Sequence, residues 1–181
     1  MNRKHTSTPS RGTLYYQEST GRLVRIMPGF FVPEHAELSD INMMQWIHTK
    51  QPDAVMNLIS ALSFHGLTTQ IPAYLSLAVP RGQVVPKNFV TPIKAWYTKR
   101  EWIFCGVQQC SGDYGQYLVT SPERTLVDCF RYRNKIGLEI FLEALQQGIK
   151  KHSYDFNKIS ELSDIFRMST LIKPYIKTAV I

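Results

Sequence analysis

Three cysteines and five histidines are the residues of this chain that could bind zinc. Cys105 and Cys110 are five positions apart, Cys129 follows later, and the histidines show no ligand spacing. A structural zinc site needs about four well-placed ligands. Cys105 lies in an apolar stretch, where a cysteine packs as a small hydrophobic residue. The pattern predicts no metal and no cofactor, and an odd cysteine count does not suggest a disulfide framework.

Carboxylates are the other candidates for chemistry. Asp113, Glu123 and Asp128 could act in a nucleic-acid-processing enzyme if they converged with a lysine around a metal ion. Glu123 also suits the first turn of a helix, and Asp128 follows Arg124 by four positions, the spacing of an intrahelical ion pair. His65, at the end of a predicted helix, has the ordinary role of a polar residue near a helix C-terminus. No phosphate-loop, dinucleotide, nucleophile-elbow or metalloprotease motif is present, so we predict no catalytic residue and no enzyme.

Basic side chains predict contact with a polyanion. The chain has 21 Lys and Arg residues against 14 Asp and Glu residues, a net charge of +7. Basic residues binding nucleic-acid phosphates release counterions, which favours association. The candidates near the start are Arg3, Lys4, Arg11, Arg22 and Arg25, with Glu18 as the acid among them. A second, weaker candidate face comes from a stretch without acids, and consists of Lys87, Lys94, Lys99 and Arg100.

Composition and length predict a globular protein. A chain of 181 residues with 44% hydrophobic residues can bury a substantial core. Its start has no apolar segment like that of a signal peptide, and no apolar run approaches the ~18–20 residues of a membrane span. We therefore expect a cytoplasmic protein without a membrane partner.

The elements that must position these residues predict an α+β fold. Residues 1–12 are polar and are predicted to form a flexible basic tail. β structure is expected from Leu14 onward. Residues 13–33 are predicted to form a wing-like hairpin with its turn at Met27-Pro28-Gly29. The remaining part, 34–181, is predicted as one mixed domain, with a central sheet of about four strands flanked by helices. Strands are expected at 74–79, 91–97, 101–107 and 116–119, and helices at 34–50, 52–64, 121–130, 137–150, 155–166 and a last stretch interrupted by Pro174.

The segment Ser121-Pro-Glu-Arg-Thr-Leu-Val-Asp128 has a strong helix start. Thr120 or Ser121 can act as N-cap, and Thr120 with Glu123 has capping-box spacing. Pro122 sits where a missing N–H costs nothing. Leu126 and Val127 then continue toward the core.

Four segments, in order, resemble one family. They are Gly21-Arg22-Leu23-Val24-Arg25 with Pro28-Gly29-Phe30-Phe31-Val32, then Ser60-Ala-Leu-Ser-Phe-His-Gly-Leu67 with Gln70-Ile71-Pro72, then Leu77-Ala-Val-Pro-Arg-Gly82, and finally Ser121–Asp128. Together they resemble the AbiEi antitoxins of type IV (abortive-infection) toxin–antitoxin systems. The motif residues are Ser60, Leu62, His65, Gly66, Leu67, Pro72, Ser121, Pro122, Glu123, Arg124, Thr125 and Asp128.

The resemblance implies two activities. An N-terminal winged helix would bind operator DNA and repress its own operon, with Arg22 and Arg25 in the wing. A C-terminal domain, 34–181 here, would counteract a nucleotidyltransferase-like toxin without forming a stable complex. A helix-turn-helix needs about three helices before the wing. Only some 20 residues precede Arg22, and they show no helical pattern, so we expect a wing without a recognition helix.

Two other functions stay open from the sequence. One is the metal-dependent enzyme built on Asp113, Glu123 and Asp128. The other is a protein-interaction domain that has lost DNA binding, which would capture a protein partner but shift no DNA at low salt.

Overall fold

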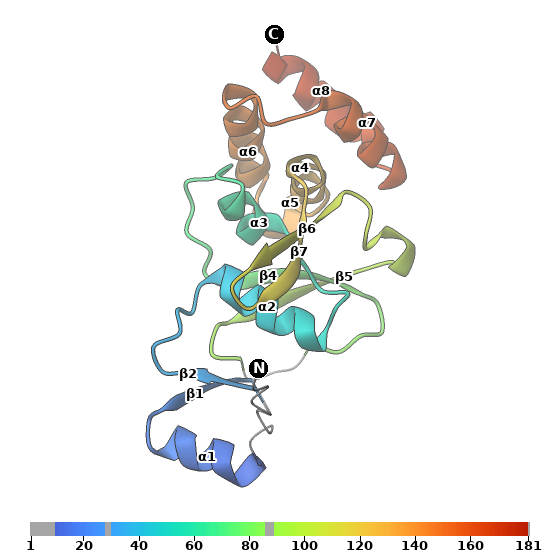
Figure 1. Cartoon of the computed structure of the whole chain (residues 1–181). Helices are drawn as coiled ribbons and strands as arrows, with labels where there is room; N and C mark the ends of the chain where they lie inside the picture. The colour runs from blue at the N-terminus through green and yellow to red at the C-terminus, as the bar shows by residue number, and fades with distance from the viewer. Residues whose placement is uncertain (1–9, 28–29, 86–88, 181) are drawn as a thin grey trace, which may run out of the picture. The chain divides into compact units, whose positions relative to one another are not determined.

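The computed structural model describes residues 10–27, 30–85 and 89–180 (Figure 1). The chain divides into two compact units. The first comprises Met1–Leu38 and Val85–Thr91, and the second comprises Ser39–Val84 and Pro92–Ile181. Helices and strands are mixed along the chain, which confirms the predicted α+β class.

The first unit contains a helix followed directly by an antiparallel hairpin. Helix α1 covers Arg11–Ser19, strand β1 covers Leu23–Met27 and strand β2 covers Phe30–Pro33. Val24 lies opposite Val32, and Arg25 lies opposite Phe31. The predicted hairpin is therefore present, whereas Pro28 and Gly29 of its expected turn lie outside the described residues.

Helix α1 overturns the expectation of β structure from Leu14. The hydroxyl oxygen of Ser10 accepts a hydrogen bond from the backbone N–H of Thr13 at 3.2 Å and caps the helix start. Gly21, with φ +70°, adopts the left-handed conformation by which the chain leaves the helix. Arg11, which we expected in a flexible tail, is the first residue of α1. Residues 1–9 of that predicted tail lie outside the described residues.

The helices of the second unit largely match the prediction. They are α2 (Asp40–Lys50), α3 (Leu58–Phe64), α4 (Pro122–Arg131), α5 (Arg133–Ile136), α6 (Leu138–Lys150), α7 (Phe156–Ile165) and α8 (Ser169–Val180). Helix α2 begins six residues later than expected, because the side chain of Ser39 accepts a hydrogen bond from Asn42 N and caps it there. Helix α8 continues through Pro174 instead of being interrupted there.

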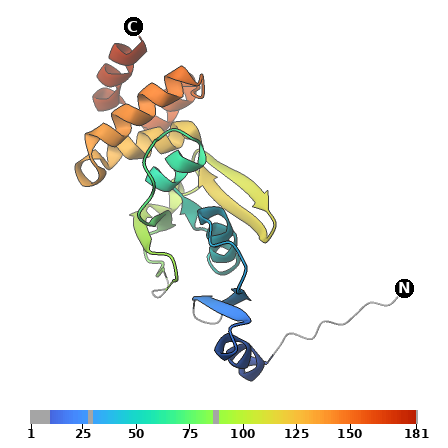
Figure 2. The same ribbon diagram turned by 90° about the vertical axis from the view of Figure 1, so that its left-hand side faces the viewer.

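Five strands form the sheet of the second unit among the described residues, where about four were expected. They are β3 (Val55–Met56), β4 (Leu75–Pro80), β5 (Ile93–Thr98), β6 (Val107–Gly112) and β7 (Gly115–Thr120). The spatial order is β5-β4-β3-β7-β6, with β4–β5 and β3–β7 parallel and the other two pairs antiparallel. Figures 1 and 2 place α2 on the opposite side of this sheet from α4 and α6.

Two sequence predictions fail within this sheet. We expected residues 52–64 to form one helix, but Val55 and Met56 form the short central strand β3, and α3 begins only after Asn57. We also expected a strand at 101–107. Instead, Arg100–Trp102 forms a 3₁₀ turn, and the next strand, β6, begins at Val107. Both stretches are apolar enough for either structure, so tertiary pairing decides between them.

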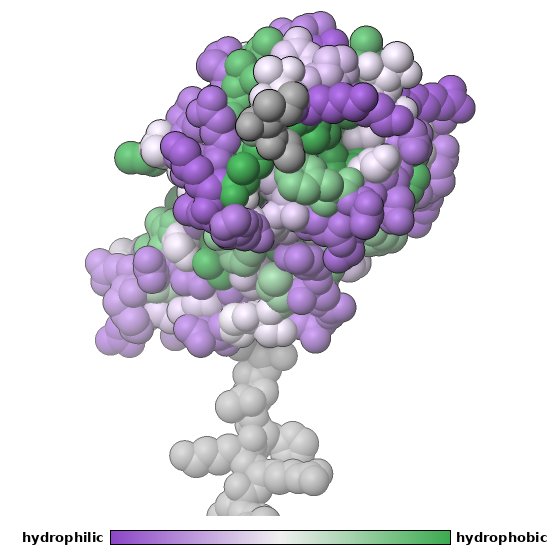
Figure 3. Space-filling view, turned by 90° about the horizontal axis from the view of Figure 1, so that it is seen from above, coloured by the Kyte–Doolittle hydropathy of each residue, from purple (hydrophilic) through white to green (hydrophobic). Residues whose placement is uncertain are grey.

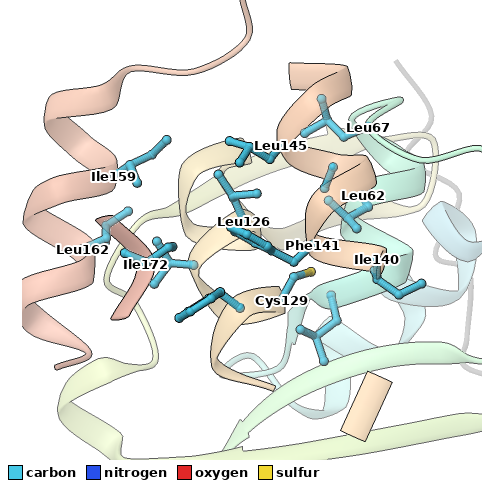
Figure 4. Packing of buried hydrophobic residues seen from close by; sticks show 14 of the residues in the cluster. Leu62, Leu67, Leu126, Cys129, Ile140, Phe141, Leu145, Ile159, Leu162 and Ile172 are labelled. Carbon is cyan, nitrogen blue, oxygen red and sulfur yellow. The ribbon is translucent and has the colours of Figure 1, made fainter. Parts of the chain in front are cut away.

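A large core cluster of the described residues lies between α3, α4 and the C-terminal helices. Figure 4 shows Leu126 and Cys129 of α4 packed against Phe141 and Leu145 of α6, with Ile159 of α7 alongside. All five side chains are buried. Burial raises the pKa of the Cys129 thiol well above its usual range, so this cysteine packs as an apolar residue.

No helix in the described part of the chain is both long enough and apolar enough to cross a membrane.

Candidate nucleic-acid interface

The described cations of the first unit lie on α1 and the hairpin. Arg11, Arg22 and Arg25 are all exposed, and within the described residues none of them forms an ion pair. Their exposure is compatible with the predicted contact with a polyanion, which stays a prediction. Arg3 and Lys4, named with them, lie outside the described residues.

Tyr15 links α1 to the hairpin. Its ring contacts Phe31 of β2 edge to face, with ring centroids 5.5 Å apart. The guanidinium carbon of Arg25 on β1 lies 5.9 Å from the centroid of the same ring. Tyr16, the next residue of α1, is 66% exposed. The unit thus presents arginines and an exposed tyrosine on a helix and hairpin that are braced by aromatic packing.

The second predicted face is rearranged by the fold. Lys99 pairs with Glu101 at 3.3 Å, and Arg100 pairs with Asp53 at 3.7 Å. Both cations are therefore partly neutralised, one by Glu101, which directly follows the acid-free stretch, and the other by Asp53, which the fold brings from 28 positions before it (81 minus 53). Lys87, the fourth member, lies outside the described residues.

Lys94 forms no ion pair within the described residues and gains neighbours that the sequence did not predict. Its Nζ lies 4.9 Å from the ring centroid of Tyr74 and 4.8 Å from that of Trp96. Lys135 of α5 approaches the same Trp96 ring, with its Nζ 6.0 Å from the centroid. Lys94 and Lys135 are 41 positions apart in the sequence (135 minus 94), so no local pattern could pair them.

The family-like motifs of α3 and α4 meet at the end of β7. His65, the C-cap residue of α3, forms a hydrogen bond through Nε2 with the carbonyl oxygen of Thr120 at 2.7 Å. Gly66 follows with φ +65°, the left-handed conformation that ends a helix. Leu62 and Leu67 are fully buried on either side of this turn, whereas Pro72 is half-buried beyond it. The two motifs, distant in sequence, therefore share one packed junction.

Ser60 of the same motif ties α3 to β4. Its hydroxyl oxygen accepts a hydrogen bond from the backbone N–H of Ser76 at 3.0 Å and donates one to the carbonyl of Tyr74 at 3.3 Å. The side chain of Ser76 in turn accepts a hydrogen bond from the indole N–H of Trp96 at 2.8 Å. These bonds fix the position of Trp96, beside which Lys94 and Lys135 lie.

Arg124 and Asp128 form the predicted ion pair inside the core. Nε of Arg124 donates to Oδ2 of Asp128 at 2.8 Å, and the two side chains are only 1% and 2% exposed. Nη1 of Arg124 also donates to the backbone carbonyls of Trp102 and Cys105. The guanidinium carbon stacks 4.0 Å from the ring centroid of Phe166. Arg124 thus joins α4 to the turn after the 3₁₀ segment and to the residue that ends α7.

Of the two N-caps predicted for α4, Thr120 and Ser121, the structure has Ser121. Ser121 is the N-cap, and its hydroxyl oxygen accepts from the backbone N–H of Arg124 at 3.2 Å, with Pro122 in the first helical turn. The alternative capping box between Thr120 and Glu123 is wrong. A carboxylate oxygen of Glu123 accepts from the backbone N–H of Asp155 at 3.2 Å, and Thr120 shares a hydrogen bond with Thr125 at 2.7 Å.

The carboxylates of the enzyme hypothesis have separate roles. Glu123 holds the start of α7, Asp128 is neutralised by Arg124, and Asp113 lies in the turn between β6 and β7. Within the described residues no three His, Cys, Asp or Glu side chains gather as metal ligands would. Cys105 and Cys110 are half-buried free thiols.

An apolar pocket of about 470 Å³ lies between α6 and α8. Leu142, Leu145, Pro174 and Tyr175 are among its lining residues. Figure 3 shows hydrophobic side chains gathered in a hollow on this face, with hydrophilic side chains around them. Such a surface suits a protein partner better than a nucleic acid.

Comparison with known proteins adds no assignment: no protein-family model matches the chain, and no curated protein is significantly similar to it.

His65 predicts a pH dependence of stability. Burial lowers the pKa of His65 below 6.5, despite the opposing effects of the Thr120 carbonyl and of Glu123. As the pH falls, His65 therefore binds a proton in the unfolded chain at a higher pH than in the folded protein. The contribution of His65 to stability is complete above about pH 6.5 and falls as the pH decreases toward the lowered pKa. We expect the midpoint of urea unfolding to change less between pH 7 and pH 5 in His65→Gln than in the wild-type protein. An unchanged pH profile would contradict this role.

Proposed function

We propose that the protein is a DNA-binding antitoxin and repressor of a type IV toxin–antitoxin system. In this role its first unit binds operator DNA, and its second unit counteracts a nucleotidyltransferase-like toxin in the cytoplasm without a stable complex. The family-like motifs support the assignment, because they include Ser60, His65, Arg124 and Asp128, which hold the second unit together.

The observation that carries the DNA-binding half is the order of helix α1 and hairpin β1–β2. A winged helix has this order, with its last helix reading base edges and its hairpin contacting phosphates or the minor groove. We expected a wing without a recognition helix, and the position of α1 directly before the hairpin supports the proposal that α1 takes the part of such a helix. In this proposal the exposed Arg11 and Tyr16 of α1 contact DNA. Arg22, which directly precedes β1, and Arg25, within β1, contact it from the hairpin.

DNA binding is tested with labelled duplex taken from immediately upstream of the gene. Arg22→Gln/Arg25→Gln is expected to reduce the slope of log affinity against log salt by about 2, roughly 0.9 for each phosphate that the protein no longer neutralises. Lys173→Gln/Lys177→Gln on α8 is the matched control, since it removes the same charge from exposed positions. Equal slopes for the two variants would contradict the proposed contact.

The antitoxin half needs its own experiment. The protein is co-expressed with a nucleotidyltransferase-like gene encoded next to it, and growth is followed after toxin induction. Rescue of growth without co-purification of the two proteins is expected. No rescue would count against the antitoxin role, and a stable complex would favour a protein-interaction domain using the apolar pocket between α6 and α8.

A further inference from the structure

Two exposed lysines lie beside Trp96 in the second unit, an exposed arginine acts on the adjacent Tyr132, and we call these three cations the Trp96 cluster. Lys94 belongs to β5, Lys135 belongs to α5, and Arg81 directly follows β4. The ammonium groups of Lys94 and Lys135 lie 4.8 and 6.0 Å from the Trp96 ring centroid. Trp96 packs against Tyr132, with ring centroids 4.8 Å apart. Burial raises the pKa of the Tyr132 hydroxyl, and the positive charges of Arg131, Arg124 and Arg81 oppose this rise.

The Trp96 cluster lacks acidic partners. Within the described residues, none of its three cations forms an ion pair. After burial, the Asp128 carboxylate is the other group that raises the pKa of Tyr132, and Asp128 is already paired with Arg124 at 2.8 Å and with Arg131 at 3.9 Å. Nearby Lys99 and Arg100, by contrast, each have a carboxylate. Gathering positive charges without a counter-charge is unfavourable, and an anion bound across them would relieve the repulsion.

The aromatic rings hold the cluster in place but cannot act as stacking platforms. Trp96 is only 5% exposed, and its indole N–H is bonded to Ser76. Its ring is approached by two ammonium groups, so a nucleic-acid base cannot stack on it. The ligand chemistry that remains is a set of spaced negative charges, which a phosphate backbone provides and which carries no base specificity.

We propose that the Trp96 cluster binds the phosphate backbone of duplex DNA, as a contact separate from that of α1 and the hairpin. This inference rests on the proposed function, because it assigns the second unit a part in holding the same DNA. The contact adds affinity uniformly across sequences, while sequence preference comes from the first unit.

The test uses the full-length chain and fluorescence anisotropy with two labelled duplexes, the upstream fragment and a scrambled fragment of equal length. Lys94→Gln/Lys135→Gln is expected to weaken both complexes severalfold and to reduce the salt slope by about 2 on each. The control Lys173→Gln/Lys177→Gln is expected to keep a steeper salt slope than Lys94→Gln/Lys135→Gln. Lys94→Arg/Lys135→Arg keeps the charge and is expected to retain the wild-type slope, which separates lost charge from lost structure.

Each outcome has a distinct meaning. A slope for the glutamine variant equal to that of the α8 control would overturn the inference. Binding of inorganic phosphate that Lys94→Gln/Lys135→Gln abolishes, with the DNA affinity of that variant unchanged, would also overturn it, since it would indicate a site for a free anion. If neither duplex is preferred but both depend on Lys94 and Lys135, the operator function fails while the backbone contact stands.

Discussion

Replacing Arg124 by methionine is expected to lower the free energy of unfolding by about 3–5 kcal/mol, because the buried carboxylate of Asp128 keeps only the more distant Arg131, at 3.9 Å. Arg124 and Asp128 are 1% and 2% exposed, so water cannot replace the lost guanidinium. The substitution also removes the donors for the carbonyls of Trp102 and Cys105. Urea unfolding, followed by circular dichroism, measures the effect.

The matched control for Arg124 is an exposed pair with similar chemistry. Lys158 lies 3.7 Å from Asp155, and their side chains are 63% and 44% exposed. Lys158→Met should change stability by no more than about 1 kcal/mol. The double variant Arg124→Met/Asp128→Leu should recover part of the loss, since the buried carboxylate is then removed as well. If the double variant were no more stable than Arg124→Met alone, the buried carboxylate would not be the cause.

Gly106→Ala is expected to be the second strongly destabilising substitution, by about 2–5 kcal/mol. The residue has φ +63°, which costs an L-residue about 1–2 kcal/mol. An added Cβ would also lie 2.9 Å from Cβ of Arg124 and 3.1 Å from a methyl group of Leu162, and such overpacking costs about 1–3 kcal/mol more. The Gly106 carbonyl meanwhile accepts the backbone N–H of Ser121 at 2.8 Å, so the backbone cannot move aside freely.

Gly82 separates the two costs at Gly106. It has φ +88°, but an added Cβ would meet nothing within 4 Å. Gly82→Ala should therefore show only the conformational cost, about 1–2 kcal/mol. Thermal melts of both variants measure the difference. Equal losses for the two substitutions would mean that the packing of Gly106 against Arg124 and Leu162 contributes nothing.

Helices whose first residues are set by an N-cap next to them in the sequence could be predicted from local signals. The N-caps Ser121 and Asp155 bind backbone N–H groups of their own first turns, and their helices begin one residue after the predicted starts. Ser39 caps α2 in the same way, but the predicted helix was begun six residues too early. Helix α1 has equivalent signals in Ser10 and Gly21, but they were missed because the residues between them were read with the β-like hairpin that follows.

Elements and contacts that depend on distant pairing were not predictable in the same way. Strand β3 is two residues long and exists because β4 and β7 flank it. The acid-free stretch suggested that Lys99 and Arg100 were free cations, but Glu101 and Asp53 approach them in the folded chain. Lys135 was not among the predicted binding residues, since only the fold brings it close to Trp96.

The central position of β3 bears on how the chain folds during synthesis. Val55 pairs with Leu118 and Met56 pairs with Val119, so β3 stays without its β7 partner until the ribosome has added more than 60 residues (119 minus 56 is 63). At about 5–20 residues per second this interval lasts roughly 3–13 s. Strands β3 and β4 are entirely buried in the finished protein. The nascent chain therefore carries an apolar strand edge for seconds, and that edge is a natural binding site for a chaperone.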